Sequence, residues 1–179
     1  MATQKLKDLI HYVCWKCDDP KKLGATKLHK IVWLADVSLY LETGLSITGA
    51  EYEKRQNGPV PRGGIAARTQ LEHDRKIVGR PIRIGPYDQH SFVAVEPPDM
   101  AAFSPREVEL IDAVIEDVCN NHSAASISDA SHEMVWHAAA IGEEIPLYAY
   151  LASQPATPTE ADLAWANAAI ARLEGHDDG

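Results

Sequence analysis

The sequence lacks the features that mark several common protein classes. Its 179 residues include three cysteines, and this small, odd number argues against a disulfide framework and fits a reducing cytoplasm. It contains no window of about 18 apolar residues, so we expect no membrane-spanning segment. Residues 1–13 form an amphipathic pattern with charged side chains, unlike the uninterrupted apolar stretch of a secretory signal. Together these absences predict a cytoplasmic protein.

The signature motifs of common enzymes are also missing. There is no glycine-rich nucleotide loop, no nucleophile elbow and no helical zinc-protease motif. Cys14 and Cys17 form a C-x-x-C, but only Cys119 and His122 are candidates for a second ligand pair. We therefore expect both thiols of the motif to pack in the core. The sequence predicts no metal, no cofactor and no enzyme activity.

Positive charge is scarce and unevenly placed. The chain has 17 Lys and Arg against 26 Asp and Glu, a net charge of −9, which makes a nucleic-acid-coating protein an unfavoured interpretation. Residues 54–83 nevertheless hold eight basic and two acidic side chains, whereas residues 84–179 hold two basic and seventeen acidic ones. This split favours a charged macromolecular partner. An ordinary solvated surface with uneven charge is the alternative.

The most informative stretch is a predicted central helix at residues 26–42. Its apolar residues cover nearly the whole circumference of a helix, which indicates a buried element. Thr26 is the expected N-cap, and Gly44 is placed to end the helix. Residues 57–61, Asn-Gly-Pro-Val-Pro, follow as an expected rigid loop, because two prolines fix the backbone and a glycine permits a close approach.

Asp36 lies in the middle of this predicted buried helix. A buried carboxylate must be hydrogen-bonded or paired, so we expect Asp36 to clamp the following loop to the helix. Candidate partners are the amides near Gly58, His132 or one of the arginines. A general base is the less favoured role for Asp36, because no second catalytic group is evident. An unrecognised hydrolase that uses Asp36 and His132 is a further alternative function.

The remaining patterns predict a mainly α (α+β) fold, a compact helical domain around the buried central helix with a small antiparallel β-hairpin. Further helices are expected at 3–17, 61–76, after Ser104 and from about 126. The helix after Ser104 has the start signals Ser104 as N-cap, Pro105 at the first position and Glu107 at the third. Strands are expected at 77–84 and 91–95, and residues 51–56 are a candidate third strand. Residues 1–152 are the expected domain. Residues 153–179 are expected to form a proline-containing linker and an amphipathic helix.

Two separated blocks of sequence resemble the Panacea domain, the SocA-like or phage-associated GepA-like antitoxin domain. The first block contains Leu34-Ala35-Asp36, Ile47-Thr48-Gly49 and Gly58-Pro-Val-Pro61. The second runs from Ile127 to His132, with Trp136 and Glu144-Ile145-Pro146. The resemblance spans about residues 5–151. It implies structural roles for the motif residues Asp36, Thr48, Gly49, Gly58, Pro59, Pro61, Ser131, His132 and Trp136.

The resemblance implies an antitoxin that neutralises a co-encoded toxin by direct binding. One branch of the family is understood to act as an adaptor, so a cytoplasmic AAA+ protease is a second implied partner, and a homodimer stays open. The candidate partner-binding residues lie in or beside the loop and in residues 54–83, which we call the basic band. They are Tyr52, Lys54, Asn57, Arg62, Arg68 and Arg75. The alternative function is a nucleic-acid-binding regulatory module with a winged-helix-like layout, in which Arg68, Arg75, Arg80 and Arg83 approach phosphates.

Overall fold

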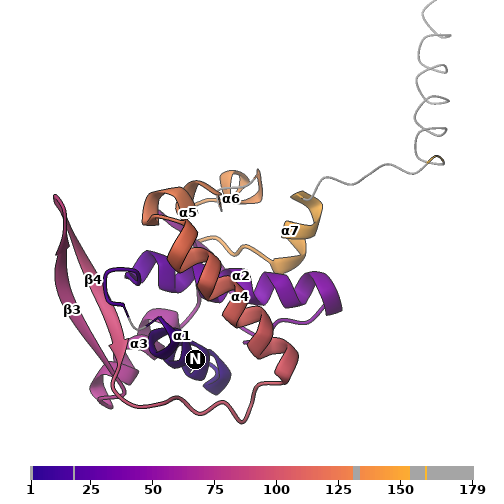
Figure 1. Cartoon of the computed structure of the whole chain (residues 1–179). Coiled ribbons are helices and arrows are strands. Elements are labelled where there is room, and N and C mark those ends of the chain that lie inside the picture. Colours follow the sequence, from indigo (N-terminus) through magenta and orange to yellow (C-terminus); the bar gives the residue numbers. More distant parts are fainter. Residues whose placement is uncertain (1, 18, 131–133, 154–159, 161–179) are drawn as a thin grey trace, which may run out of the picture.

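A computed structural model describes residues 2–17, 19–130, 134–153 and 160 of the chain. The architecture is mainly helical with two separate two-stranded antiparallel sheets, which confirms the predicted class (Figure 1). The helices are α1 Gln4–Lys16, α2 Ala25–Thr43, α3 Gly64–His73, α4 Pro105–Asn121, α5 Ala124–Ala130, α6 Met134–Ala138 and α7 Leu147–Ser153. The strands are β1 Tyr52–Arg55, β2 Gly58–Pro61, β3 Ile77–Ile84 and β4 Tyr87–Ala94.

Helix α2 is the central element, as the sequence predicts. Most of its residues are buried, and α1, α4, α5 and α7 all contact it. It ends at Gly44, whose φ of 76° is left-handed and whose N–H donates to Tyr40 O. The prediction of its N-cap was wrong, because the helix begins at Ala25 and its N-cap is Gly24, which has no capping side chain. The first amides of α2 are therefore not covered by a side-chain acceptor.

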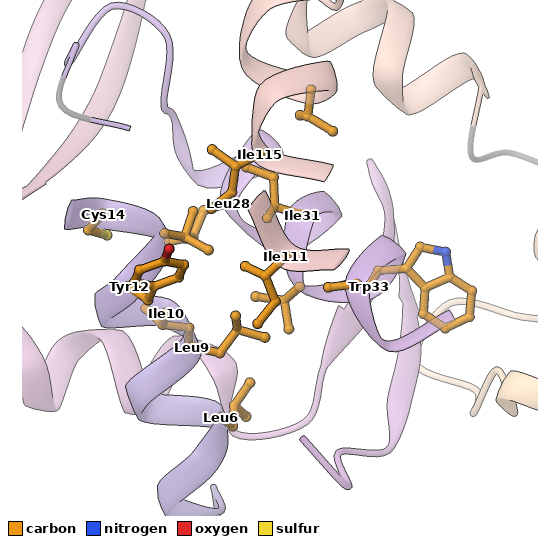
Figure 2. Close-up of a cluster of buried hydrophobic side chains, with 14 of the residues drawn as sticks. Leu6, Leu9, Ile10, Tyr12, Cys14, Leu28, Ile31, Trp33, Ile111 and Ile115 are labelled. Carbon is orange, nitrogen blue, oxygen red and sulfur yellow. The ribbon is translucent and has the colours of Figure 1, made fainter. Parts of the chain in front are cut away.

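The hydrophobic core lies where α1, α2 and α4 meet. Figure 2 shows apolar side chains of the three helices converging, among them Leu9 of α1, Ile31 of α2 and Ile111 of α4, all completely buried. Each such side chain contributes about 1.5–3 kcal/mol on burial. Helix α4 begins with the expected capping box, in which Ser104 Oγ accepts from Glu107 N and Glu107 accepts from Ser104 N. This local signal fixes where α4 begins.

Strands β1 and β2 form a hairpin that the sequence only partly predicts. Residues 51–56 were a candidate third strand of one sheet, but β1 instead pairs with β2 in a sheet of its own, with Tyr52 opposite Pro61 and Arg55 opposite Gly58. The expected rigid loop is thus strand β2, and the prolines are tolerated because β2 is an edge strand. The other edge of β1 bonds to residues 142–145, through Lys54 N to Glu143 O and Ile145 N to Tyr52 O.

Strands β3 and β4 form the expected hairpin beside the helical body (Figure 1). Their connection is the two residues Gly85 and Pro86, shorter than the gap predicted between residues 84 and 91, so β4 begins at Tyr87. Helices α1 and α3 pack against this hairpin. Helix α3 is shorter than expected and begins after Gly63, which has a left-handed φ of 79°.

Gly79 on β3 gives a first prediction about stability. A Cβ at this position would lie 2.6 Å from His90 Nε2 and 3.2 Å from Phe92 Cε1, and would also overlap the Glu72 carboxylate. We expect Gly79→Ala to lower the free energy of unfolding by about 1 kcal/mol, because the Glu72 and His90 side chains can turn aside while the buried Phe92 ring cannot. Urea unfolding measures this. Arg80→Ala, at the exposed next position, is the matched control, and an equal effect of both variants would contradict the steric explanation.

The C-terminal part of the chain is only partly described. The helix expected from about residue 126 is represented by α5 and α6. Helix α7 covers the apolar stretch that begins at Leu147. The predicted linker and amphipathic helix of residues 153–179 lie almost wholly outside the described residues, so the domain division stays a prediction. None of the described helices combines the length and apolar character that crossing a bilayer requires.

Candidate functional site

Asp36 is the centre of a buried polar cluster that attaches the segment after α2 to the helix. Its Oδ1 accepts from Thr48 N at 2.8 Å, and its Oδ2 accepts from Thr48 Oγ1 and, at 2.6 Å, from Tyr52 Oη. Asp36 is 0% exposed and Tyr52 1%. The carboxylate therefore clamps the chain as expected, but its partners are Thr48 and Tyr52 rather than Gly58, a histidine or an arginine.

The environment of the clamp explains why it needs several donors. Burial raises the pKa of Asp36, while the donors Thr48 and Tyr52 act in the opposite direction. Burial and the neighbouring carboxylate raise the pKa of Tyr52 well above its usual value. The Tyr52 ring also meets Trp33 edge-to-face at 4.7 Å between centroids. Every hydrogen bond here serves to fix the chain, so the geometry supports a structural role for Asp36.

The two sequence blocks that carry the family signature meet in space. Lys54 Nζ donates to Ala139 O at 2.9 Å and lies 3.9 Å from the centre of the Trp136 ring, a cation–π geometry. Ser128 Oγ is 3.4 Å from Asn57 O. The motif residues Gly58, Pro59 and Pro61 are buried in β2, and Ser131 and His132 lie outside the described residues. The described residues of the two blocks thus meet at a packed junction between the β1–β2 hairpin and residues 128 and 136–145.

The six candidate partner-binding residues fall into two groups. Tyr52 and Lys54 are buried with their polar atoms bonded inside the chain, which differs from the expectation that they face a partner. The other four reach the surface: Asn57, Arg62 and Arg75 are exposed, and Arg68 is partly exposed. Arg62 pairs with Glu51 at 2.7 Å. The sequence did not reveal that Tyr52 and Lys54 are buried. Strand β1 has four residues, and a pattern this short does not show which face of the strand lies inside.

The arginines of the basic band also differ in their contacts. The Arg68 guanidinium lies 4.7 Å from the centre of the Phe92 ring and 3.9 Å from the Glu72 carboxylate. By contrast, Arg75, Arg80 and Arg83 are exposed and form no ion pair with any described residue. The exposed positive charge is therefore concentrated at the end of α3 and along β3.

The C-x-x-C cysteines do not act as a pair. Cys14 is completely buried in the core, as expected, and burial raises the pKa of its thiol to about 12. Cys17 is also buried, as expected, and it lies beside Cys119 of α4, with 2.9 Å between the sulfur atoms. The hydrogen bond from Cys17 lowers the pKa of Cys119, so Cys119 is the more readily ionised of the two thiols. Nothing in the sequence spacing pointed to this contact across 102 positions.

We expect hydrogen peroxide to join Cys17 and Cys119. The Cys119 thiolate would be oxidised to a sulfenic acid with loss of one water, and Cys17 would displace a second water to form the disulfide. Intact-mass spectrometry should record a loss of about 2 Da that is reversed by dithiothreitol. Cys14→Ser should behave like wild type and Cys119→Ser should not change in mass this way. A Cys14–Cys17 cross-link would contradict the assignment.

The described residues contain no cluster of three or more His, Cys, Asp or Glu side chains arranged to hold a metal ion. The fold and the clamp together define a mainly helical α+β domain in which Asp36, Thr48 and the motif residues of β2 are buried. The chain belongs to the family described as antitoxin SocA-like, Panacea domain, whose model matches residues 28–137. The suspected family resemblance is thereby confirmed. Neither the curated proteins nor the solved structures gave a match to the chain.

Proposed function

We propose that this protein is the antitoxin of a toxin–antitoxin pair, and that it neutralises a co-encoded toxin in the cytoplasm by binding it directly. The observation that carries this proposal is the antitoxin-like family match over residues 28–137. The buried clamp adds support. Because Asp36, Thr48 and Tyr52 hold the hairpin against α2, the surface beside it is rigid before a partner arrives, which reduces the entropy lost on binding.

The exposed polar and basic residues that flank this hairpin and follow α3 are the contact surface that we favour. Asn57 and Arg62 flank β2, and Arg75 follows α3, where its backbone has a positive φ of 59°. An acidic face on the toxin would be attracted to this surface, and the attraction would accelerate encounter. The acidic half of the chain would instead suit a toxin with a basic active site.

Co-expression with the toxin encoded beside this gene tests the proposal. Wild-type protein should restore growth of toxin-expressing cells and co-purify with the toxin. Arg62→Glu combined with Arg75→Glu should weaken binding by about tenfold or more if the basic surface makes the contact. Lys21→Glu, a reversal at another exposed position, is the matched control. No rescue and no binding by the wild-type chain would overturn the proposal.

The same co-expression experiment also distinguishes inhibition of the toxin by binding alone from delivery of the toxin to a protease. If the protein acts as an adaptor, the toxin should disappear faster when the antitoxin is present, and rescue should require the cytoplasmic AAA+ protease. If binding alone suffices, rescue should persist in protease-deficient cells with an unchanged toxin lifetime. Pulse–chase measurement of the toxin distinguishes the two outcomes.

One observation favours a second function. The β3–β4 hairpin presents Arg80 and Arg83 without ion-pair partners among the described residues, as expected of a wing that contacts phosphates. A gel shift with the DNA upstream of the gene should then weaken steeply with salt. Arg80→Gln and Arg83→Gln should reduce the salt dependence, and binding that is equal for both variants and wild type would exclude this function.

A further inference from the structure

The end of α1 and the last turn of α4 meet at a pair of thiols. Cys17 is the C-cap of α1 and Cys119 lies in α4, with 2.9 Å between their sulfur atoms. A disulfide bond has a length of about 2.05 Å, so the two sulfurs need to approach each other by less than about 1 Å. The reduced protein therefore holds both atoms close to bonding distance.

Polar contacts on both sides of the two thiols fix α1 against α4. Directly before Cys17, Lys16 Nζ donates to Asp112 Oδ2 at 2.8 Å. Beyond the thiols, Lys22 Nζ donates to Asn120 Oδ1, also at 2.8 Å. Side chains of both helices also pack in the same hydrophobic core. Because these contacts hold the helices in register, formation of the bond requires small side-chain movements rather than a shift of either helix.

A small oxidant can reach the two thiols. Cys17 and Cys119 line a pocket of about 380 Å³, and they are 5% and 8% exposed, whereas Cys14 is completely buried. The hydrogen bond from Cys17 lowers the pKa of Cys119, burial opposes this effect, and the charges of Lys27 and Lys22 add to it. Since the thiolate is the form that attacks an oxidant, Cys119 is the attacking thiol.

We propose that Cys17 and Cys119 form a redox site, at which hydrogen peroxide makes a disulfide that lengthens the lifetime of the folded protein. The inference does not depend on the proposed antitoxin function. The Cys119 sulfur attacks one oxygen of the peroxide, the O–O bond breaks, and the other oxygen leaves as hydroxide, which takes up a proton. Cys17 then displaces the remaining oxygen as water, so two thiols are oxidised and one peroxide is reduced to two waters.

The new bond closes a loop that contains most of the described chain. The two cysteines are 102 positions apart, and α2, α3 and both sheets lie between them. A cross-link that closes a long loop restricts the unfolded chain more than one that closes a short loop. Because the folded helices already hold the sulfurs together, the bond adds little strain to the native state. The oxidised protein therefore unfolds less often than the reduced protein.

Reduced unfolding links the redox site to the lifetime of the protein. Proteases cleave chains that have opened, so the rate of degradation follows the population of the unfolded state. In a compartment kept reducing by thiols the disulfide is transient, as in other redox-sensing proteins. The protein thus persists while peroxide is present and returns to its ordinary turnover when thiol reductants open the bond.

Comparison of the two redox states of the purified protein tests the inference. Wild type is oxidised with a small excess of hydrogen peroxide, and intact mass measures the cross-linked fraction. The oxidised form should melt about 5–10 °C above the reduced form, and thermolysin should digest it about tenfold more slowly. Dithiothreitol should abolish both differences. Failure of the cross-link to form, or a cross-linked protein that melts and is digested like the reduced form, would overturn the inference.

Three alanine variants identify the thiols that matter. Cys14→Ala keeps the pair and should show the full difference between its oxidised and reduced samples, whereas Cys17→Ala and Cys119→Ala should each show none. Each comparison uses two redox states of the same variant, so a loss of stability due to the substitution itself cancels. Either pair variant suffices if the other does not fold. A full difference in a pair variant, or none in Cys14→Ala, would contradict the assignment.

Cells extend the comparison to protein lifetime. In pulse–chase measurements, a brief peroxide treatment should lengthen the lifetime of wild type about twofold or more. The lifetime of Cys119→Ala should be the same with and without peroxide, which controls for effects of the oxidant on the proteases. An equal response of the two proteins, or a wild-type lifetime that peroxide leaves unchanged, would overturn the role of the disulfide in turnover.

Discussion

Asp36→Ala is expected to lower the free energy of unfolding by about 3–5 kcal/mol. The substitution removes the one acceptor group shared by Thr48 N, Thr48 Oγ1 and Tyr52 Oη, in a site that water does not reach. Thr48 N and Thr48 Oγ1 lose this acceptor at a cost of about 1–3 kcal/mol each, whereas Tyr52 Oη keeps Val32 O as an acceptor at 3.2 Å. Since small domains are stable by about 5–15 kcal/mol, the variant should lie near the limit of folding. Urea denaturation followed by circular dichroism measures the loss.

Two further variants make this expectation specific to the clamp. Tyr52→Phe removes one donor and keeps the carboxylate bound to Thr48, so it should cost only about 1 kcal/mol. Glu42→Ala removes a carboxylate from the same helix that pairs at the surface with Arg106, and the urea midpoint should hardly move. If Asp36→Ala were no more destabilising than Glu42→Ala, the clamp would not stabilise the fold.

The stability should also fall on acidification because of His29. Its pKa is about 4 in the folded state against 6.5 as the reference value for the unfolded state. Below pH 6.5 the unfolded chain therefore takes up a proton that the folded chain does not. The stability due to neutral His29 is fully present above pH 6.5 and is lost as the pH falls to about 4. The loss amounts to about 3 kcal/mol.

The measurement compares wild type with His29→Gln at pH 7 and pH 4.5. Carboxylates titrate in both proteins, so the difference between them isolates the histidine. The advantage of wild type over the variant should shrink by about 2–3 kcal/mol across this range. Ser38→Ala, which removes no titrating group from the same helix, should show a constant difference. A constant difference for His29→Gln would contradict the assigned burial of the neutral ring.

Features set by neighbours in sequence were predicted correctly. The capping box of Ser104 and Glu107 and the left-handed Gly44 each require only a few adjacent residues, and the apolar circumference of α2 is visible in its composition. Thr26 failed as an N-cap because Gly24 already adopts the extended conformation that the cap position needs. A side-chain preference at one position cannot fix where a helix begins when packing favours another.

Features that join distant residues were not predictable from one sequence. The need of Asp36 for partners was clear, but the choice of Thr48 and Tyr52 depends on how the chain returns to α2. The contact between Cys17 and Cys119, and the burial of Lys54 against Trp136, span 102 and 82 positions. Hydrophobic periodicity and secondary-structure propensity describe residues that are close in sequence, so they carry no information about such distant pairs.

The two-sided pairing of β1 has a consequence for synthesis on the ribosome. One edge of this strand is satisfied by β2 shortly after it emerges, but the other waits for residues 142–145, roughly ninety positions later. Until then the nascent chain carries a strand with bare amides and carbonyls, which are a template for pairing with other chains. Shielding of this edge by a chaperone during translation would therefore matter more for this protein than for one whose strands pair only with their immediate neighbours.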